Sequence, residues 1–239
     1  MILVLTMAGR YQRFANEGFK VPKYLLPWGD RTVLSVILAE LLAGGTFSQV
    51  LLVANHRDEA YMPHVRAVMK RHGIPANHLL MTHDTSGQAE TAMIGAEACA
   101  RVLQQPGAPL VFHNIDTVLF KRNFSEMQQA LASADGYIDV FRSSNRNYSY
   151  VLIDADRRVT EIAEKIVVSD LATSGLYGFA SSVVFKEFYR PGEDLYVSAI
   201  YKRMITQGRR LLVGQVHHES DTVVLGTPDE YMNAALLML

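Results

Sequence analysis

The sequence predicts an α/β fold with a mixed, mostly parallel central sheet and helices on both faces. Short continuous apolar runs such as Ile2–Thr6 and Gln49–Asn55 are typical of strands that are buried on both faces. Longer segments with leucine, valine and alanine at helical spacing separate these runs. Strands and helices therefore alternate through the first half of the chain, which favours right-handed crossovers and a parallel sheet.

The first half contains the more regular pattern. Strands are expected at residues 2–6, 49–55, 78–82 and 108–116, and helices at 32–45, 59–73 and 86–105. Thr32 and Ser86 are candidate N-caps for the first and third of these helices, while Gly45 and Gly73 are suitable stop signals. Ligands on such sheets bind at the carboxyl ends of the strands, so the loops that follow the strands are the first places to look for function.

The second half has a different character. Strands are expected at 136–141, 148–154, 158–165, 175–181 and 210–218, and helices at 195–208 and 227–239. Thr227 is expected to cap the last helix, with Pro228 in its first position and Asp229 and Glu230 at the positive end of its dipole. Because no linker, repeat or low-complexity segment is evident, residues 1–239 are expected to form one domain.

Composition excludes several classes of protein. The 239 residues are 49% hydrophobic and 20% charged, and 23 basic residues against 24 acidic ones give a net charge of -1, which does not suggest nucleic acid or a membrane surface as a partner. The one cysteine, Cys99, lies in an apolar run and is expected in the core, without a disulfide or zinc. With no signal peptide and no apolar run near the ~20 residues that span a bilayer, we expect a cytoplasmic protein.

The loop after the first strand carries four cations in a short span, which are Arg10, Arg13, Lys20 and Lys23. Arg13 and Lys23 are the best candidates for phosphate contacts, because an arginine fork and a lysine charge are common partners of polyphosphates. Gly9 is expected to permit a tight turn that exposes backbone N–H groups. The alternative is a solvated basic loop, which Pro22 disfavours for Lys23 by stiffening the chain before it.

Three further segments carry candidate site residues. Asp116 ends a buried strand, where its carboxylate suits Mg²⁺ together with substrate phosphates, or simply forms a turn. His113, within that strand, is expected to be a packed histidine. The turn at 85–91 offers backbone groups to the edge of a planar base, or serves only as a helix cap. Glu164 and Lys165 form a charge pair at a strand end, for which a solvated pair is the default interpretation.

Six segments in order resemble the sugar-1-phosphate nucleotidyltransferase family, which includes glucose-1-phosphate thymidylyltransferase. They are "MAGRYQRF…PKYLLPWG", "GQAET", "NID", "VTEIAEK", "SGLYGF" and "GTPDEY", and together they extend along nearly the whole chain. The resemblance implies the Rossmann-like fold of nucleotide-diphospho-sugar transferases. It also implies a reaction in which a sugar 1-phosphate attacks the α-phosphate of an NTP, giving an NDP-sugar, for instance for surface polysaccharide, and pyrophosphate.

The resemblance also implies roles for individual residues. Residues implied to contact the nucleotide are Ala8, Gly9, Arg10, Arg13, Lys23, Gly87 and Gln88, with Arg13 at the β- and γ-phosphates, Lys23 near the α-phosphate, and Gly87 and Gln88 facing the base. Asp116 would hold Mg²⁺. Glu164 would contact the sugar, Lys165 its phosphate, and Gly175 the sugar ring. Arg13, Lys23 and Asp116 would carry catalysis, which relies on positioning and charge neutralisation. Self-association is common in the family, although this sequence has no interface signature.

Two positions depart from the family pattern. Tyr11 stands where the family has a second loop glycine, and its side chain is expected to constrain φ and occupy space near the phosphates. Val224 stands where many members have a second metal-binding aspartate. Asp221 lies three residues earlier, roughly 10 Å away along an extended strand.

Three hypotheses follow from the retained and altered residues. The first is an active nucleotidyltransferase that uses an NTP and a sugar 1-phosphate or similar phosphate. The second is a non-catalytic nucleotide- or sugar-binding protein on the same fold, motivated by Tyr11 and Val224. The third is an interaction module without a small ligand. The sequence does not specify the base or the acceptor.

Overall fold

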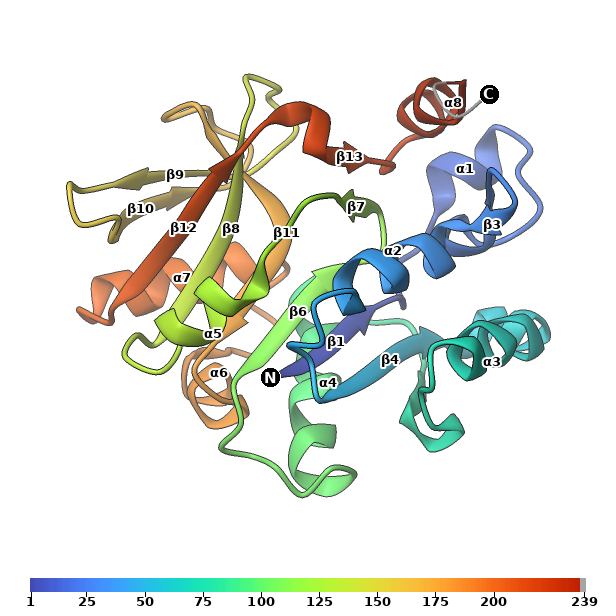
Figure 1. Ribbon diagram of the computed structural model, residues 1–239, viewed down its shortest axis with the longest axis horizontal. Coiled ribbons are helices and arrows are strands. Elements are labelled where there is room, and N and C mark those ends of the chain that lie inside the picture. Colours follow the sequence, from blue (N-terminus) through green and yellow to red (C-terminus); the bar gives the residue numbers. More distant parts are fainter. Residues whose placement is uncertain (237–239) are drawn as a thin grey trace.

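A computed structural model describes residues 1–236, and a nine-stranded sheet lies at its centre (Figure 1). Its strands are β1 (Ile2–Thr6), β4 (Gln49–Asn55), β5 (Leu79–Thr82), β6 (Leu110–Asn114), β8 (Gly136–Arg142), β9 (Tyr150–Ile153), β10 (Val159–Ala163), β11 (Leu171–Phe179) and β12 (Leu211–His217). They follow the order β10-β9-β11-β6-β1-β4-β5, and β8 pairs with β11 and β12.

The sheet is mixed and mostly parallel, as predicted. Strands β6, β1, β4 and β5 pair in parallel, and β8 pairs in parallel with β12. The antiparallel strand β11 lies between β6 and β8 and joins these two parallel groups into one sheet. The register of β1 with β6 sets Thr6 beside Asn114, so the loops that follow these strands emerge side by side.

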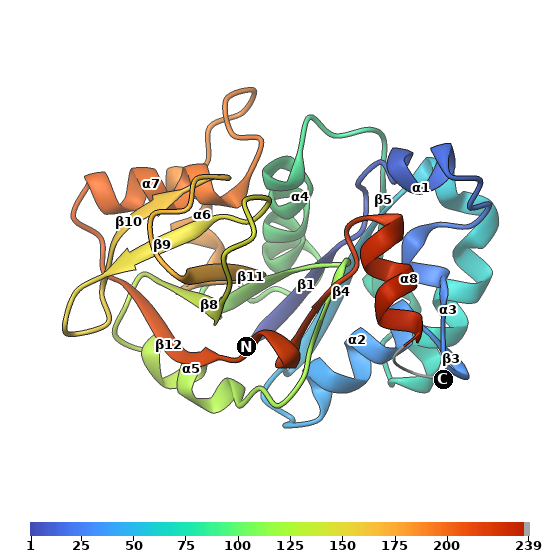
Figure 2. The ribbon, with the colours of Figure 1, turned by 90° about the horizontal axis from the view of Figure 1, so that it is seen from above.

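Helices cover both faces of the sheet. They are α1 (Gln12–Asn16), α2 (Val33–Leu42), α3 (Met62–Arg71), α4 (Gln88–Arg101), α5 (Phe124–Ala130), α6 (Ser182–Phe188), α7 (Val197–Thr206) and α8 (Pro228–Leu236). Successive residues of a strand point to opposite faces. Leu3 and Leu5 accordingly join the core beneath α2, α3 and α5, whereas Ile2 and Val4 join the core beneath α4, α6 and α7. Figure 2 shows these two helical layers with the sheet between them.

Most of the predicted elements are present, with differences at their ends. Thr32 and Thr227 cap helices, since their hydroxyls accept hydrogen bonds from Ser35 N and Glu230 N. Ser86 does not cap α4, because Gly87 occupies the N-cap and the Ser86 amide and hydroxyl donate to the Glu90 carboxylate instead. The predicted last helix is described as far as residue 236, and its final three residues lie outside the described part of the chain.

Several short elements were not predicted from the sequence. They are α1, α5, α6, the pair β7 (Thr117–Leu119) and β13 (Thr222–Val224), the pair β2 (Pro27–Trp28) and β3 (Arg31–Thr32), and four 3₁₀ turns at Lys23–Leu25, His56–Tyr61, Ala76–His78 and Glu219–Asp221. The antiparallel pair β7 and β13 matters most for function. It joins segments about a hundred residues apart and sets Val224 opposite Thr117, directly after Asp116.

A buried arginine holds this second small sheet in place. The Arg122 guanidinium donates to the Asp139 carboxylate, to the Thr222 hydroxyl and to the carbonyl of Asp221. Arg122 and Asp139 are almost completely buried, so the ion pair fixes the start of β13 against β8. The segment that leads into α8 is thereby fixed beside the carboxyl end of β6.

None of the helices within residues 1–236 combines the length and the apolar character that a bilayer crossing requires.

Candidate active site

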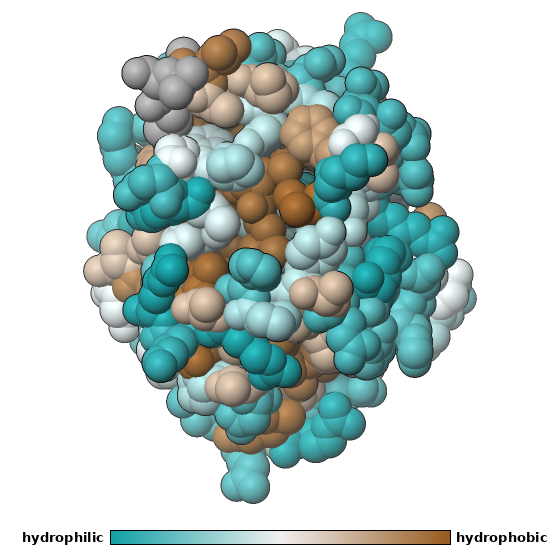
Figure 3. Space-filling model, turned by 90° about the vertical axis from the view of Figure 1, so that its right-hand side faces the viewer, coloured by the Kyte–Doolittle hydropathy of each residue, from teal (hydrophilic) through white to brown (hydrophobic). Residues whose placement is uncertain are grey.

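A cavity of about 980 Å³ opens at the carboxyl ends of β1 and β6, and every residue that the sequence singled out for the site lines it. These residues are Ala8, Gly9, Arg10, Arg13, Lys23, Gly87, Gln88, Asp116, Glu164, Lys165 and Gly175. Figure 3 views the molecule toward the carboxyl ends of β1 and β4, where apolar side chains are framed by hydrophilic ones. The volume suits a nucleotide-sized ligand.

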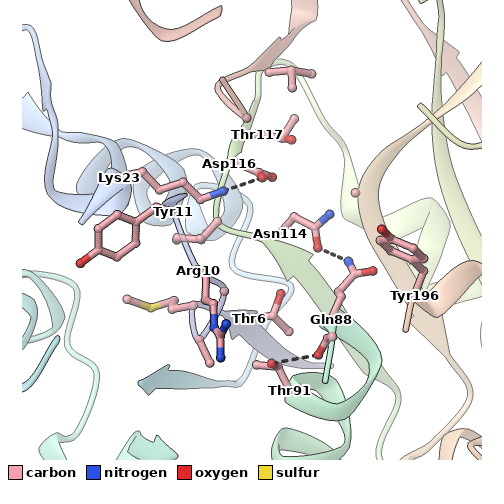
Figure 4. Close-up of a pocket in the computed structure, with 18 of the residues that line it drawn as sticks. Thr6, Arg10, Tyr11, Lys23, Gln88, Thr91, Asn114, Asp116, Thr117 and Tyr196 are labelled. Atoms are coloured by element: carbon pink, nitrogen blue, oxygen red, sulfur yellow. Dashed lines mark hydrogen bonds and ion pairs between the residues drawn. The ribbon is translucent and has the colours of Figure 1, made fainter. Parts of the chain in front are cut away.

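Lys23 and Asp116 form the central ion pair of the cavity (Figure 4). Lys23 Nζ lies 2.6 Å from Asp116 Oδ2, and both side chains are largely buried. Burial acts to raise the pKa of Asp116, but the Lys23 ammonium outweighs it and the pKa is lowered. Asp116 is therefore an anion that already holds a cation.

Arg10 and Arg13, two further cations of the opening loop, are placed differently, and Arg10 shares its partner with Arg57 from the 3₁₀ turn after β4. Arg10 and Arg57 both pair with Asp84 at 2.5 Å, and Arg57 also donates to the carbonyl of Ala8. The hydrogen bond from Arg10 and the two positive charges lower the pKa of Asp84. Arg13 lies exposed in α1 and makes no ion pair within residues 1–236, so its guanidinium is available to a ligand.

Tyr11 lines the cavity, but it does not strain the backbone as the sequence suggested. Its φ of −85° is ordinary for any residue, so glycine is not needed at this position. Its hydroxyl donates to Asp58 Oδ1 at 2.8 Å, and Tyr24 donates to the other oxygen of this fully buried carboxylate at 2.9 Å. The ring therefore anchors the loop, and in Figure 4 its hydroxyl points away from Asp116.

Gly9 also differs from its prediction. It lies in a bend without a positive φ, and a methyl group built on it would contact nothing within 4 Å. The backbone at this point does not demand glycine. What the residue contributes is open space on the wall of the cavity.

Gly87 and Gln88 connect the start of α4 to the segment before α7 and to the end of β6. A methyl group on Gly87 would lie 2.9 Å from Leu195 Cα, so only glycine permits this approach. The Gln88 side-chain amide donates to Asn114 Oδ1, and its oxygen accepts from Val197 N at 3.3 Å. Gln88 thus ties α4 to the end of β6 and to the start of α7, using both ends of its amide.

Glu164 and Lys165 are both in the cavity but do not pair with each other in the described structure. Glu164 accepts hydrogen bonds from the hydroxyls of Ser149 and Ser198. Lys165 reaches Tyr196, with its Nζ 3.4 Å from the hydroxyl and 5.2 Å from the ring centre. The default interpretation of a solvated ion pair is therefore wrong, because each charge has its own partner from another element.

Two residues of the cavity wall, Lys165 and Gly175, have backbone conformations in the left-handed region. Gly175 has a φ of 84°, and a methyl group on it would approach Asn114 Nδ2 to 2.9 Å, so glycine is required twice over. Lys165 has a φ of 57° although it has a side chain. Such outliers are common at ligand-binding positions.

Sequence reasoning missed several residues that line the cavity. They are Asn114, Tyr148, Ser149, Ser174, Tyr177, Tyr196 and Glu230. Asn114 belongs to the quoted "NID" segment, and Glu230 was interpreted only as a helix-dipole partner. The Ser174 hydroxyl is buried and has no hydrogen-bond partner in the described structure. No local pattern marks the tyrosines, because they reach the cavity from three separate places, a loop (Tyr148), strand β11 (Tyr177) and the N-cap of α7 (Tyr196).

Other predictions concern residues outside the chemistry. His113 is fully buried, with Nε2 2.8 Å from the carbonyl of Thr117, and Cys99 is buried in the core, both as predicted. Asp221 is not near the metal position, since it pairs with Lys121 at 2.8 Å and β13 keeps its register without a bulge.

The donor groups at Asp116 suit a magnesium ion that arrives with phosphates. Within residues 1–236, no three His, Cys, Asp or Glu side chains gather as a protein-only metal site. Mg²⁺ commonly uses one or two carboxylates, water and substrate phosphates. The Asp116 carboxylate already pairs with one positive charge, the Lys23 ammonium, so the residues present fit such an ion.

Fold and site together define an α/β protein with cations and several carboxylates around a cavity at the carboxyl edge of the sheet. A model described as nucleotidyl transferase matches residues 5–238, so the chain belongs to the nucleotidyl transferase family. No curated protein sequence gives a match.

Three solved structures resemble this chain over almost its entire length. A nucleoside-diphosphate-sugar pyrophosphorylase from Vibrio cholerae RC9 is 26% identical with a TM-score of 0.86, covering 98% of this chain and 99% of its own. A protein from Bacillus anthracis assigned as a glucose-1-phosphate thymidylyltransferase is 15% identical with a TM-score of 0.79, and the T. maritima inositol-1-phosphate CTP transferase is 15% identical with a TM-score of 0.73. Each of the latter two alignments covers 99% of this chain and 94% of the other. These two establish the fold alone.

Proposed function

We propose that this nucleotidyltransferase condenses an NTP with a sugar 1-phosphate or a similar phosphate ester, giving an NDP-sugar or its analogue and pyrophosphate. A phosphate oxygen of the acceptor attacks the α-phosphorus, and the bond from that phosphorus to the oxygen bridging to the β-phosphate breaks. The departing oxygen leaves as part of pyrophosphate, so no protein nucleophile is required. Synthesis of a surface polysaccharide is a suitable use for such a product.

The residues act by positioning and by neutralising charge. Arg13 would bind the β- and γ-phosphates, and Lys23 would move from Asp116 toward the α-phosphate. Ala8, Gly9 and Arg10 would border the nucleotide, and Gly87 would bring the backbone of the 85–91 turn near the base.

On the acceptor side, Lys165 would bind the acceptor phosphate and Glu164 its hydroxyl groups, with Gly175 leaving room for the ring. Mg²⁺, held by Asp116, would neutralise charge on the phosphates.

The observation that carries this proposal is the Lys23–Asp116 pair at 2.6 Å on the wall of a cavity that also contains Arg13 and Lys165. The test is to incubate the protein with each NTP, Mg²⁺ and a panel of sugar 1-phosphates and other phosphate esters, and to measure pyrophosphate. One pair should give rapid release that requires both substrates. If no pair gives release while the V. cholerae protein does so under the same conditions, the proposed reaction is wrong.

Val224 favours a second candidate, a nucleotide- or sugar-binding protein without turnover. The valine side chain has no oxygen for a metal, and Val224 lies opposite Thr117, the residue after Asp116. Calorimetry with each NTP distinguishes the candidates, because binding at micromolar concentration without pyrophosphate release would support the binding protein. Binding that Lys23→Ala abolishes would place the nucleotide in this cavity and exclude an interaction module without a small ligand.

A further inference from the structure

The sequence around Glu230 suggests a helix-capping role for its side chain. Thr227 and Glu230 form the S/T-x-x-E capping box, in which the glutamate turns back to the amide of the N-cap residue. Only one half of this box is made. Glu230 N donates to Thr227 Oγ1 at 3.2 Å, whereas the Glu230 carboxylate accepts no hydrogen bond from any residue within 1–236. Helix capping therefore does not account for where this carboxylate points.

The carboxylate lies in the cavity on the side of Asp116. A methyl group built on Gly226 would lie 3.4 Å from Glu230 Oε2 and 3.8 Å from Asp116 Oδ2, so a small gap beside Gly226 separates the two carboxylates. Asp116 Oδ2 is also the atom that Lys23 contacts. Burial, and after it the nearby charge of Glu230, raises the pKa of Tyr148, another residue of the cavity wall, to about 12.

The fold holds Glu230 in this position. Leu225 N donates to the carbonyl of Asp116 at 2.7 Å, which fixes the chain after β13 beside the end of β6. The next residues begin α8, and Tyr231 packs against Phe14 of α1 and donates to the carbonyl of Pro27 at 2.7 Å. Figure 1 shows α8 beside α1 at the end of this path. The helix N-terminus is thus fixed from both sides.

We propose that Glu230 supplies the second negative charge of the metal site, in place of the carboxylate that Val224 lacks. The inference rests on the proposed function, because it assumes that Asp116 holds a divalent cation. With Glu230, a cation at Asp116 meets two protein carboxylates, which is within the usual range for Mg²⁺. Asp221 does not take this role because it pairs with Lys121.

The direct test measures Mn²⁺ binding by electron paramagnetic resonance, with the full-length protein and without nucleotide, so that it does not depend on turnover. Glu230→Gln keeps the shape of the side chain and removes its charge, and we expect about a tenfold rise in the Kd for Mn²⁺, since two carboxylates hold a divalent ion more tightly than one. Asp229→Asn is the matched control. It removes a charge from the same helix turn at an exposed position outside the cavity, and its Kd should stay within about twofold of wild type.

A rescue variant separates a metal role from a role in capping α8. Val224→Asp in the Glu230→Gln background returns a carboxylate beside Asp116 without restoring the glutamate, and it should recover Mn²⁺ affinity close to wild type. Equal Kd values for wild type and Glu230→Gln, with unchanged melting temperature, would overturn this inference and leave the proposed reaction intact. If the Asp116→Asn variant binds Mn²⁺ as tightly as wild type does, both the inference and the assignment of Asp116 are wrong.

Discussion

The two halves of the cavity are built in different ways. On the side proposed to bind the nucleotide, the groups stand on regular elements or close to the end of one: Lys23 opens a 3₁₀ turn, Gln88 begins α4, and Asp116 lies two residues after β6. On the acceptor side, Lys165 and Gly175 both adopt left-handed backbone conformations. The groups proposed to bind phosphates thus stand on or beside short regular elements, whereas the residues proposed to bind the acceptor depend on left-handed backbone and on side-chain hydrogen bonds.

The difference has a consequence for specificity. Glu164 is held by hydroxyls from Ser149 and Ser198, which come from two separate elements. Ser149 lies in the loop before β9 and Ser198 in the first turn of α7, so changes there would alter the proposed acceptor pocket without disturbing the parallel strands. The following predictions test where the division between the two sides of the cavity lies.

The largest effect is expected for Asp116→Ala, on the nucleotide side. Removing a carboxylate that neutralises charge through a metal ion costs several kcal/mol at the transition state, so kcat should fall by about a thousandfold. Steady-state pyrophosphate release with the best substrate pair measures this effect. Because Lys23 keeps about a fifth of its side-chain surface exposed, its ammonium can turn to water when its partner is removed, and we expect the variant to remain folded, as thermal denaturation would show. Unchanged turnover would show that Asp116 does not hold the metal.

The second prediction concerns His113 in β6, the strand shared by both halves. Burial lowers the pKa of this histidine from 6.5 to about 4, so the folded protein binds fewer protons than the unfolded chain between these values. Its contribution to stability is therefore complete above pH 6.5 and is lost as the pH falls toward 4, by about 2 kcal/mol between pH 7 and pH 5. Urea denaturation at both pH values measures the loss.

The control for this prediction is His113→Phe. The variant is less stable at every pH, because the carbonyl of Thr117 loses its partner, but the part of the pH dependence that His113 causes should disappear. If wild type and variant lose the same stability between pH 7 and pH 5, His113 is not the group responsible.

The third prediction compares a glycine from each side. Gly175→Ala requires a left-handed alanine within 2.9 Å of Asn114 Nδ2, and we expect a loss of about 1–2 kcal/mol of stability and a raised KM for the acceptor. Gly9→Ala, whose methyl group would meet nothing within 4 Å, is the matched variant and should leave the melting temperature unchanged. Thermal denaturation and acceptor titration measure both effects. Equal melting temperatures for the two variants would contradict the comparison.

The nucleotide side was also the more predictable one from sequence. Ile2–Thr6 and Gln49–Asn55 are strands with the predicted bounds, because a short, continuous apolar run bounded by polar residues is typical of a buried strand. β7 and β13 were missed, since three-residue strands acquire their identity only from a partner a hundred residues away. α6 was missed for a similar reason, because seven residues with a Ser181 cap give too short a pattern beside the predicted strand.

The site residues were predictable from the sequence, but their contact partners were not. Every residue chosen for the site lines the cavity. The resemblance identified the motifs in order along the chain, and the parallel fold brings the strand ends that carry them together. Their partners were not predicted, since contacts such as Gly87 with Leu195 depend on three-dimensional packing and leave no local signal. The direction of the Glu230 carboxylate could not be predicted either, because its sequence context also suits a capping box.

The last prediction concerns Tyr11 in the opening loop, where only one hydroxyl is removed. Tyr11→Phe removes one of two hydroxyls that donate to the fully buried Asp58 carboxylate, while the ring and its packing remain. We expect a loss of about 1–2 kcal/mol in the free energy of unfolding, because a buried acceptor loses one partner. Tyr24→Phe removes the other hydroxyl and should cost a similar amount in the same urea titration. Since the Tyr11 hydroxyl bonds Asp58 and points away from Asp116, Tyr11→Phe should leave the KM for the NTP within about twofold of wild type. A large rise in that KM at unchanged stability would mean that Tyr11 contacts the phosphates and that the loop is not anchored through Asp58.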